Sequence, residues 1–264
     1  MLAGQGVAGQ SRPAVVNLAW MNADDLRWTE TDLAGRPCRV FNLPDNGVPR
    51  YTIVYLHRLN PQELDSEWFA AALTRRQVQA VCPLAGPSWW ADRICLPFDK
   101  EVTAEQFVLD HALPLAREVS GGESARVGLL GIGMGGQGAL RIAYKHPELF
   151  LFVAAVDPAI DYQQRIDEGD RVLASMYRDV EDARQDTATL HIHPLNWPRH
   201  QWFCCDPNDW RWYDSVERLR MKLYSLGVPH ECDLETEGVD RPEGYLQTMI
   251  DPALQFVTKR LDQL

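Results

Sequence analysis

The chain has 264 residues, of which 45% are hydrophobic and 24% are charged, and its formal net charge is -11 at pH 7. This length and composition predict one soluble globular domain with a large core, and the negative charge disfavours phosphate backbones and anionic membranes as partners. The partner classes that remain are a small-molecule ligand, another protein, and a second copy of the chain in a homo-oligomer.

The first 16 residues, MLAGQGVAGQSRPAVV, lack both a basic segment and an unbroken apolar stretch, so no secretory signal is predicted. No later run is long and apolar enough to span a bilayer. The six cysteines form no C-x-x-C pair, which indicates free thiols in a reducing cytoplasm. We expect a flexible tail over residues 1–13 and a single domain over 14–264.

Strand-like and helix-like segments alternate through the first half of the chain, which predicts an α/β protein. The segment PDNGVP contains Asn46-Gly47, a pair that favours a hairpin between the strands on either side of it. The strands are expected at 39–43, 51–56 and 78–82, and the helices at 63–76 and 102–117.

Residues 127–150, VGLLGIGMGGQGALRIAYKHPELF, predict a strand, a tight turn and a helix in that order. Gly131, Gly133, Gly135 and Gly136 permit backbone angles and close approaches that a Cβ atom would prevent. A turn of this kind directs backbone N–H groups and the positive end of the helix dipole to one point above the sheet. We expect the functional site at that point.

Two known motifs share this geometry. The nucleophile elbow of hydrolases is G-x-S-x-G, and residues 131–135 follow it except that Gly133 occupies the serine position. The dinucleotide-binding fingerprint is G-x-G-x-x-G. Gly131, Gly133 and Gly136 satisfy it, and Asp157 follows at about the spacing of the acidic residue that binds the ribose. The motif alone leaves an NAD-binding oxidoreductase open.

The second half of the chain continues the alternation. Its strands are expected at 149–156, 201–205 and 230–234, and its helices at 160–186, 213–226 and near the end of the chain. His191 and His193 have the spacing of metal ligands on one strand face. No third ligand accompanies them at a convincing spacing, so no metal site is predicted.

The run MGGQGALRIAYKHPELF resembles the segment after the catalytic serine in esterase D and S-formylglutathione hydrolase-like esterases, where M-G-G-x-G-A-L and a later H-P-x-x-F recur. A dinucleotide fingerprint has no reason to carry these residues. The resemblance covers about residues 51–261. It implies an α/β-hydrolase fold, with a mostly parallel central sheet, helices on both faces and no cofactor. Residues 158–198 would then form a cap or lid, or a connecting segment.

The resemblance also assigns the positions of a Ser-His-Asp triad. Gly133 stands at the nucleophile position. Residues 205–210, CDPNDW, resemble the family's G-x-x-D loop and place the acid at Asp209. The family's Gly-Gly-His-Asp loop corresponds to EGVD at 237–240, which places Val239 where the histidine base is expected. Only the acid position keeps a residue that can perform its role.

In the resembling esterases the oxyanion hole uses the amide after the nucleophile, here that of Met134, together with amides that follow a Leu-His-Gly sequence. In this chain His57 is followed by Arg58 and Leu59. A long cationic side chain thus replaces the glycine, and it either obstructs the hole or extends into solvent. Three tryptophans are further substrate-binding candidates, which either line a pocket or pack in the core: Trp89, Trp90 and Trp210.

These assignments predict a catalytically degenerate esterase homologue that keeps a pocket for a small molecule or a partner. An active carboxylesterase or thioesterase with a relocated nucleophile is the alternative, and an NAD-binding oxidoreductase is a weaker one. The groups available to a relocated triad form no pair that their sequence spacing supports: Ser88, Cys204, Cys205, His57, His191 and His193.

Overall fold

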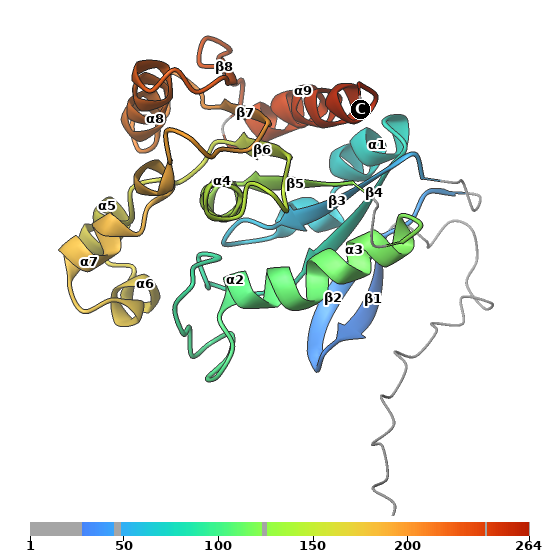
Figure 1. The fold of residues 1–264 in the computed structure, drawn as a ribbon, viewed down its shortest axis with the longest axis horizontal. Coiled ribbons are helices and arrows are strands. Elements are labelled where there is room, and N and C mark those ends of the chain that lie inside the picture. Colours follow the sequence, from blue (N-terminus) through green and yellow to red (C-terminus); the bar gives the residue numbers. More distant parts are fainter. Residues whose placement is uncertain (1–27, 45–48, 123–125, 241, 264) are drawn as a thin grey trace, which may run out of the picture.

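An eight-stranded mixed sheet runs through the centre of the structure, a computed structural model that describes residues 28–44, 49–122, 126–240 and 242–263 (Figure 1). The strand order is β1-β2-β4-β3-β5-β6-β7-β8. The predicted tail, residues 1–13, lies outside the described residues. The strands are β1 (Trp28–Leu33), β2 (Arg36–Phe41), β3 (Tyr51–Leu56), β4 (Val78–Pro83), β5 (Val127–Ile132), β6 (Phe152–Val156), β7 (His200–Cys204) and β8 (Glu231–Asp233).

The sheet is mostly parallel, as predicted. From β4 to β8 neighbouring strands are parallel, whereas β1 and β2 add an antiparallel pair at one edge. Every residue of β5 and β6 is buried. Their near-continuous apolar sequences suit strands that helices cover on both faces.

Helices cover both faces of this sheet (Figure 1). One face packs against α1 and α9, and the other against α3, α4, α8 and the helices of residues 158–198. None of the described helices is long and apolar enough to cross a membrane. The helices are α1 (Glu67–Arg75), α2 (Ala104–Phe107), α3 (Leu113–Val119), α4 (Met134–Lys145), α5 (Tyr162–Asp167), α6 (Arg171–Met176), α7 (Val180–Gln185), α8 (Tyr213–Ser225) and α9 (Glu243–Leu261).

The hairpin predicted around Asn46-Gly47 is wrong. β2 pairs with β1 and β4, and β3 lies between β4 and β5, so the strands on either side of this pair are not neighbours. Asn46 and Gly47 themselves lie outside the described residues. The hairpin of this region is β1–β2, whose turn residues Ala34 and Gly35 both have positive φ, 52° and 78°. Two such residues make the turn that matches the twist of paired strands.

The predicted helix over 102–117 is interrupted. α2 begins with a capping box between Thr103 and Gln106, and a π-helical turn over Val108–Ala112 separates it from α3. Pro114 stands in the first turn of α3. Because proline has no N–H group and its ring crowds the preceding turn, the chain widens there rather than continuing as a regular α-helix.

The carboxyl ends of the central strands lie in one row. Leu56 of β3 pairs with Gly131 of β5, Ile132 pairs with Val156 of β6, and Val156 pairs with Cys204 of β7. The segments that follow these strands therefore meet at one edge of the sheet. All the loops that the sequence assigned to a triad or an oxyanion hole follow strands that end at this edge.

Residues 158–198 contain α5, α6 and α7, and buried ion pairs attach this segment to α4. The guanidinium of Arg141 on α4 is buried and donates hydrogen bonds to the carboxylates of Asp186 and Glu105. Its Nε atom also donates to the backbone carbonyl of Asp186, at 2.9 Å. The hydroxyl of Tyr177 donates to Asp186 Oδ2 at 2.8 Å. A buried charge that loses its partner costs several kcal/mol, so these contacts hold the segment firmly against the sheet domain.

Candidate active site

Gly133 forms the turn between β5 and α4. Its φ of 56° and ψ of -116° lie in a region that L side chains rarely adopt. Backbone hydrogen bonds hold this conformation: the N–H of Gly133 donates to Val156 O at 2.9 Å, and its carbonyl accepts from the amides of Gln137 and Ala159, each at 3.0 Å. A sharp, strained strand-to-helix turn is the geometry of a nucleophile elbow.

The glycines of this turn differ in the space around them. A Cβ atom at Gly131 would lie 2.0 Å from the carbonyl oxygen of Gly135, and one at Gly135 would lie 1.8 Å from the carbonyl oxygen of Leu56. At Gly133, the one described atom within 4 Å of an added Cβ is Arg58 Cβ, at 3.5 Å. The turn therefore requires glycine at 131 and 135 for close packing, whereas position 133 has room for a side chain.

Arg58 does not extend into solvent. Its side chain is 15% exposed, Nε donates to Glu63 Oε2 at 2.8 Å, and Nη2 donates to Glu243 Oε1 at 2.5 Å. The amide of Arg58 also donates to Glu63, at 3.4 Å. The ion pair of Arg58 with Glu243 thus joins the loop after β3 to the first turn of α9. The Arg58 amide is engaged by a carboxylate and is not available to an oxyanion.

Glu63 is the buried partner in the ion pair with Arg58. Its carboxylate also accepts a hydrogen bond from the hydroxyl of Tyr55 at 2.8 Å, and its side chain is fully buried. Burial raises the pKa of the Glu63 carboxyl, while the hydrogen bonds and charge of Tyr55 and Arg58 act in the opposite direction. Glu63 therefore depends on Arg58 for its counter-charge.

The loop after β7 and the loop after β8 lie against each other. Asp206 is buried, and its Oδ2 atom accepts the amide of Gly238 at 3.0 Å. Asp209 is partly exposed, and its Oδ1 atom accepts the amide of Arg211 at 2.9 Å. The loop of the expected base therefore stands beside the acid loop, as a triad requires. Sequence reasoning missed Asp206, although its place directly after an apolar strand was a usable signal.

Comparison with known proteins shows which fold this geometry belongs to. Residues 99–222 match the model of the family described as putative esterase, and a search of curated proteins finds no match to this sequence. The fold is similar to that of FphF, a fluorophosphonate-binding serine hydrolase of Staphylococcus aureus, with a TM-score of 0.68 at 13% identity over 84% of this chain and 92% of that one. The chain has an α/β-hydrolase fold, and its residues 99–222 match the putative esterase family.

Two further solved structures resemble this chain. An S-formylglutathione hydrolase from Agrobacterium tumefaciens gives a TM-score of 0.62 at 17% identity, over 89% of this chain and 94% of that one. A ferulic acid esterase gives 0.68 at 16% identity, over 89% and 98% of the two chains. At these identities the likeness concerns the fold.

His57 has a structural position in this α/β-hydrolase. Its Nε2 atom accepts the amide of Ala85 at 3.0 Å, so the proton of the neutral ring is on Nδ1, which donates to Arg58 O at 2.7 Å. Burial lowers the pKa of His57 to about 4. Both ring nitrogens are engaged, so the imidazole has no free position with which to take a proton from a nucleophile.

Val239 is 76% exposed, and no position from 234 to 242 holds a histidine. The other six histidines are within the described residues and contact groups elsewhere. His146 and His191 bind Glu105 and Asp186, each at 2.9 Å, and the other four stack on aromatic rings or bind backbone groups: His111, His193, His200 and His230. Among the described residues no group of three or more His, Cys, Asp or Glu side chains is arranged to hold a metal ion.

The alternative nucleophiles are buried in the structure. Ser88 is fully buried, and its Oγ atom accepts the amide of Trp90 at 3.3 Å. Cys204 and Cys205 are fully buried as well, and burial raises the pKa of both thiols far above the ordinary range. A thiol rather than a thiolate is therefore the stable form, and it is a poor nucleophile.

The three tryptophans have different environments. Trp89 and Trp90 are buried, and their indole N–H groups donate to Asp170 Oδ2 at 3.2 Å and to His57 O at 3.1 Å. Both indoles fit the packing interpretation, because Trp89 packs against Tyr162, Trp90 packs against His57, and both indole N–H groups have partners. Trp210 is exposed beside the acid loop, with the guanidinium of Arg211 over its ring. Leu59 is also exposed.

Asp157 is a titratable group at the same edge of the sheet. It follows β6 with a positive φ of 50°, and its Oδ1 atom lies 3.2 Å from the Sγ atom of Cys205. Burial, and then the negative charge of Asp209, raise the pKa of Asp157 to about 7. The sequence marked this residue for a ribose contact, whereas in the structure it faces the end of β7.

Proposed function

We propose that this chain is a catalytically degenerate esterase homologue whose elbow region binds a small molecule or a partner without hydrolysing an ester. The observation that carries the proposal is at Gly133. The turn has the strained conformation of a nucleophile elbow and space for a side chain, but glycine supplies no attacking atom. Acyl transfer through a triad requires a hydroxyl or thiol at this point.

The base position supports the same conclusion. A nucleophile in this turn would need an imidazole from the loop after β8, which Asp206 holds beside the acid loop. That loop presents Val239 and no histidine. Two separate positions of one triad have thus lost their functional groups, while Asp209 remains at the acid position.

The alternatives have less support. A relocated nucleophile would have to be Ser88, Cys204 or Cys205, and each is fully buried. An NAD-binding oxidoreductase would be expected to have the sheet order 3-2-1-4-5-6, which differs from the order found here. The six free thiols support a reducing compartment, and the net charge of -11 argues against nucleic acid as a partner.

Restoration of the missing groups tests the proposal. The wild-type protein, Gly133→Ser, Val239→His and the double variant are compared by kcat/KM for p-nitrophenyl acetate, with circular dichroism as the folding control. We expect hydrolysis above the buffer rate in the double variant alone, since a serine without a base, or a base without a serine, lacks an activated nucleophile. Turnover by the wild-type protein at the rate of an ordinary esterase would refute the proposal.

A further inference from the structure

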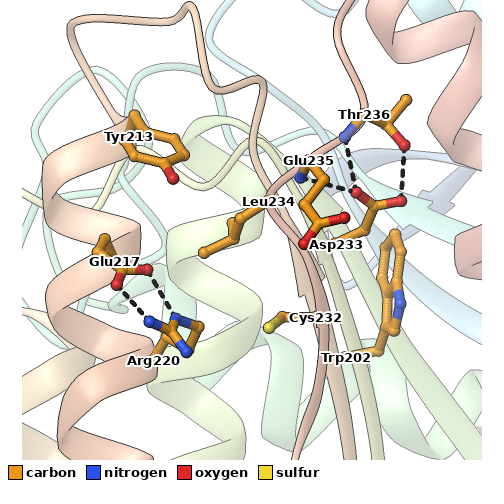
Figure 2. A pocket seen from close by; sticks show the side chains of 9 residues that line it. All are labelled: Trp202, Tyr213, Glu217, Arg220, Cys232, Asp233, Leu234, Glu235 and Thr236. Atoms are coloured by element: carbon orange, nitrogen blue, oxygen red, sulfur yellow. Dashed lines mark hydrogen bonds and ion pairs between the residues drawn. The ribbon is translucent and has the colours of Figure 1, made fainter.

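A cavity between α8 and β8 has a volume of about 780 Å³, but several of its polar groups already bind one another (Figure 2). Arg220 donates from Nε to a carboxylate oxygen of Glu217 at 2.7 Å, and Asp233 accepts the amide of Thr236 at 2.9 Å. Polar groups that bind each other do not select a ligand. A second cavity, at the other end of the same strands, differs in this respect.

The second cavity lies at the amino ends of β7 and β8. These strands begin at His200 and Glu231, and both residues lie beside the last turns of α9. The cavity has a volume of about 260 Å³, which is below the range of pockets for drug-sized ligands and suits a compact group. Its side chains are mostly cationic or aromatic, and they include Arg199, His200, His230, Glu231, Phe256 and Arg260.

Two guanidinium groups border this cavity. Arg199 is exposed and has no hydrogen-bond or ion-pair partner among the described residues. Arg260 is held in place: Nη1 donates to Gln263 Oε1 at 2.9 Å, Nη2 binds Glu231, and the guanidinium carbon lies 5.6 Å from the centroid of the Phe256 ring. These contacts use only part of its N–H groups. Both arginines can therefore donate charge-assisted hydrogen bonds to an oxyanion.

His200 lies between these charges. Its ring stacks on that of Phe152, with centroids 5.3 Å apart, and its ring nitrogens have no hydrogen-bond partner within the described part of the chain. Burial, and then the positive charges of Arg260 and Arg199, lower the pKa of His200, and the opposing effect of Glu231 is smaller. The potential at His200 is thus positive even with Glu231 in the same cavity.

His230 supplies a second imidazole. Its ring stacks on that of Phe203, with centroids 5.8 Å apart, and Nδ1 donates to Val228 O at 2.9 Å. Nε2 is the nitrogen that this contact leaves free. Stacking fixes the planes of both imidazoles, so a ligand would meet groups that are already oriented.

We propose that the cavity at the amino ends of β7 and β8 binds a compact tetrahedral dianion of the phosphate or sulfate type through Arg199, Arg260 and His200. Once His200 is protonated, three cationic side chains face the one carboxylate of Glu231, which matches a dianion. The ligand is either a free ion or the terminal group of a phosphomonoester. The site lies at the opposite end of the sheet from the elbow and does not depend on the function proposed there.

Isothermal titration calorimetry on the full-length protein tests the site, with chloride keeping the ionic strength constant. The probes are sulfate, inorganic phosphate and glycerol phosphate. Sulfate does not titrate near neutral pH, so the pH dependence of its affinity reports on the protein. The bound dianion should raise the lowered pKa of His200, so the complex takes up a proton that the free protein lacks. Sulfate affinity should therefore rise as pH falls from about 7.5 to about 6.

Three variants locate the site. Arg199→Gln should weaken sulfate binding about tenfold, because one charge-assisted hydrogen bond is lost. His200→Phe keeps the stack on Phe152 and should weaken binding and abolish the proton uptake. The matched control is Arg178→Gln. Arg178 is 83% exposed in the loop before α7, so this variant should bind as the wild-type protein does. Circular dichroism confirms that each variant is folded.

Tighter binding of glycerol phosphate than of inorganic phosphate would assign the site to a phosphomonoester, and the reverse order would assign it to the free ion. Absence of saturable binding at millimolar concentrations of all three probes would overturn the proposal. Equal affinities in the three variants would overturn it too, because the anion would then bind elsewhere. Sulfate binding by the wild-type protein without proton uptake would exclude His200 from the site and contradict the assignment.

Discussion

The Cβ atom of Arg58 lies 3.5 Å from the position that a Cβ atom would take at Gly133. Arg58, which the proposal places at the glycine of the oxyanion loop, therefore stands directly beside Gly133, which it places at the nucleophile position. Arg58 is held there by Glu63 on one side and Glu243 on the other. The two proposed departures from the esterase pattern are thus neighbours, and reversing one of them alone leaves the other in place.

We predict that Arg58→Gly raises the esterase activity of the Gly133→Ser, Val239→His double variant. Glycine would free the loop after β3 to offer an amide to the oxyanion, and one such donor is worth about 100-fold in rate. Because Arg58→Gly also leaves Glu63 buried without a counter-charge, the variant is made together with Glu63→Gln. Values of kcat/KM for p-nitrophenyl acetate measure the gain. An unchanged rate in a folded variant would show that Arg58 does not obstruct the site.

The glycines of the elbow should respond differently to alanine. Gly131→Ala and Gly135→Ala place a methyl group about 2 Å from backbone carbonyl oxygens, so each should lower the free energy of unfolding by about 3 kcal/mol or more, or prevent folding. Gly133→Ala meets no such contact and should cost about 1–2 kcal/mol, from its positive φ alone. Urea unfolding measures all three. A Gly133→Ala variant as unstable as the other two would contradict the open position at residue 133.

Arg141 should contribute strongly to stability. Arg141→Met leaves Glu105 and Asp186 buried without their shared cation, and removal of one partner from a buried ion pair costs about 3–5 kcal/mol. Arg184→Met, which breaks the exposed pair of Arg184 with Glu181, is the control and should leave the unfolding midpoint unchanged. Equal effects of the two variants in urea unfolding would argue against a buried network between α4 and residues 158–198.

Asp157 should make the protein less stable as pH rises. Its pKa is about 7 in the folded protein and 3.8 in the reference state, so between these values the folded state keeps a proton that the unfolded state has lost. The contribution of Asp157 to the free energy of unfolding is therefore largest below pH 4. It falls by roughly 2–4 kcal/mol as pH rises to 7. Asp157→Asn should flatten this slope when unfolding is compared at about pH 5 and about pH 8. Asp167→Asn, on the exposed end of α5, should retain it.

Local sequence patterns predicted the central elements well. The apolar run before Gly131 and the helical spacing after Gly136 are signals within a few residues, and β5 and α4 form where they indicated. The two loops that the sequence assigned to the acid and the base also stand beside each other at the strand ends. β1 was not predicted, because the edge sequence WTETDL alternates charged and polar residues and buries little apolar surface.

Contacts between distant segments could not be predicted in the same way. Arg58 and Glu243 are 185 residues apart in the sequence, and no spacing rule connects them. The sequence therefore could not show whether the Arg58 side chain extends into solvent or towards the elbow. The raised pKa of Asp157 depends on burial and on the negative charge of Asp209, which follows the neighbouring strand. Val239 and Gly133, by contrast, could be singled out as candidates because the motifs of the resembling esterases assign a role to each position.

The most direct test of the account is the reaction of the wild-type protein with a fluorophosphonate, followed by intact mass measurement and peptide mapping. A chain without an activated hydroxyl or thiol at the elbow should keep its unmodified mass at saturating probe, while the Gly133→Ser, Val239→His variant gains one adduct on the peptide that contains residue 133. Stoichiometric labelling of the wild-type protein at any single residue would contradict the account and identify the nucleophile that it denies.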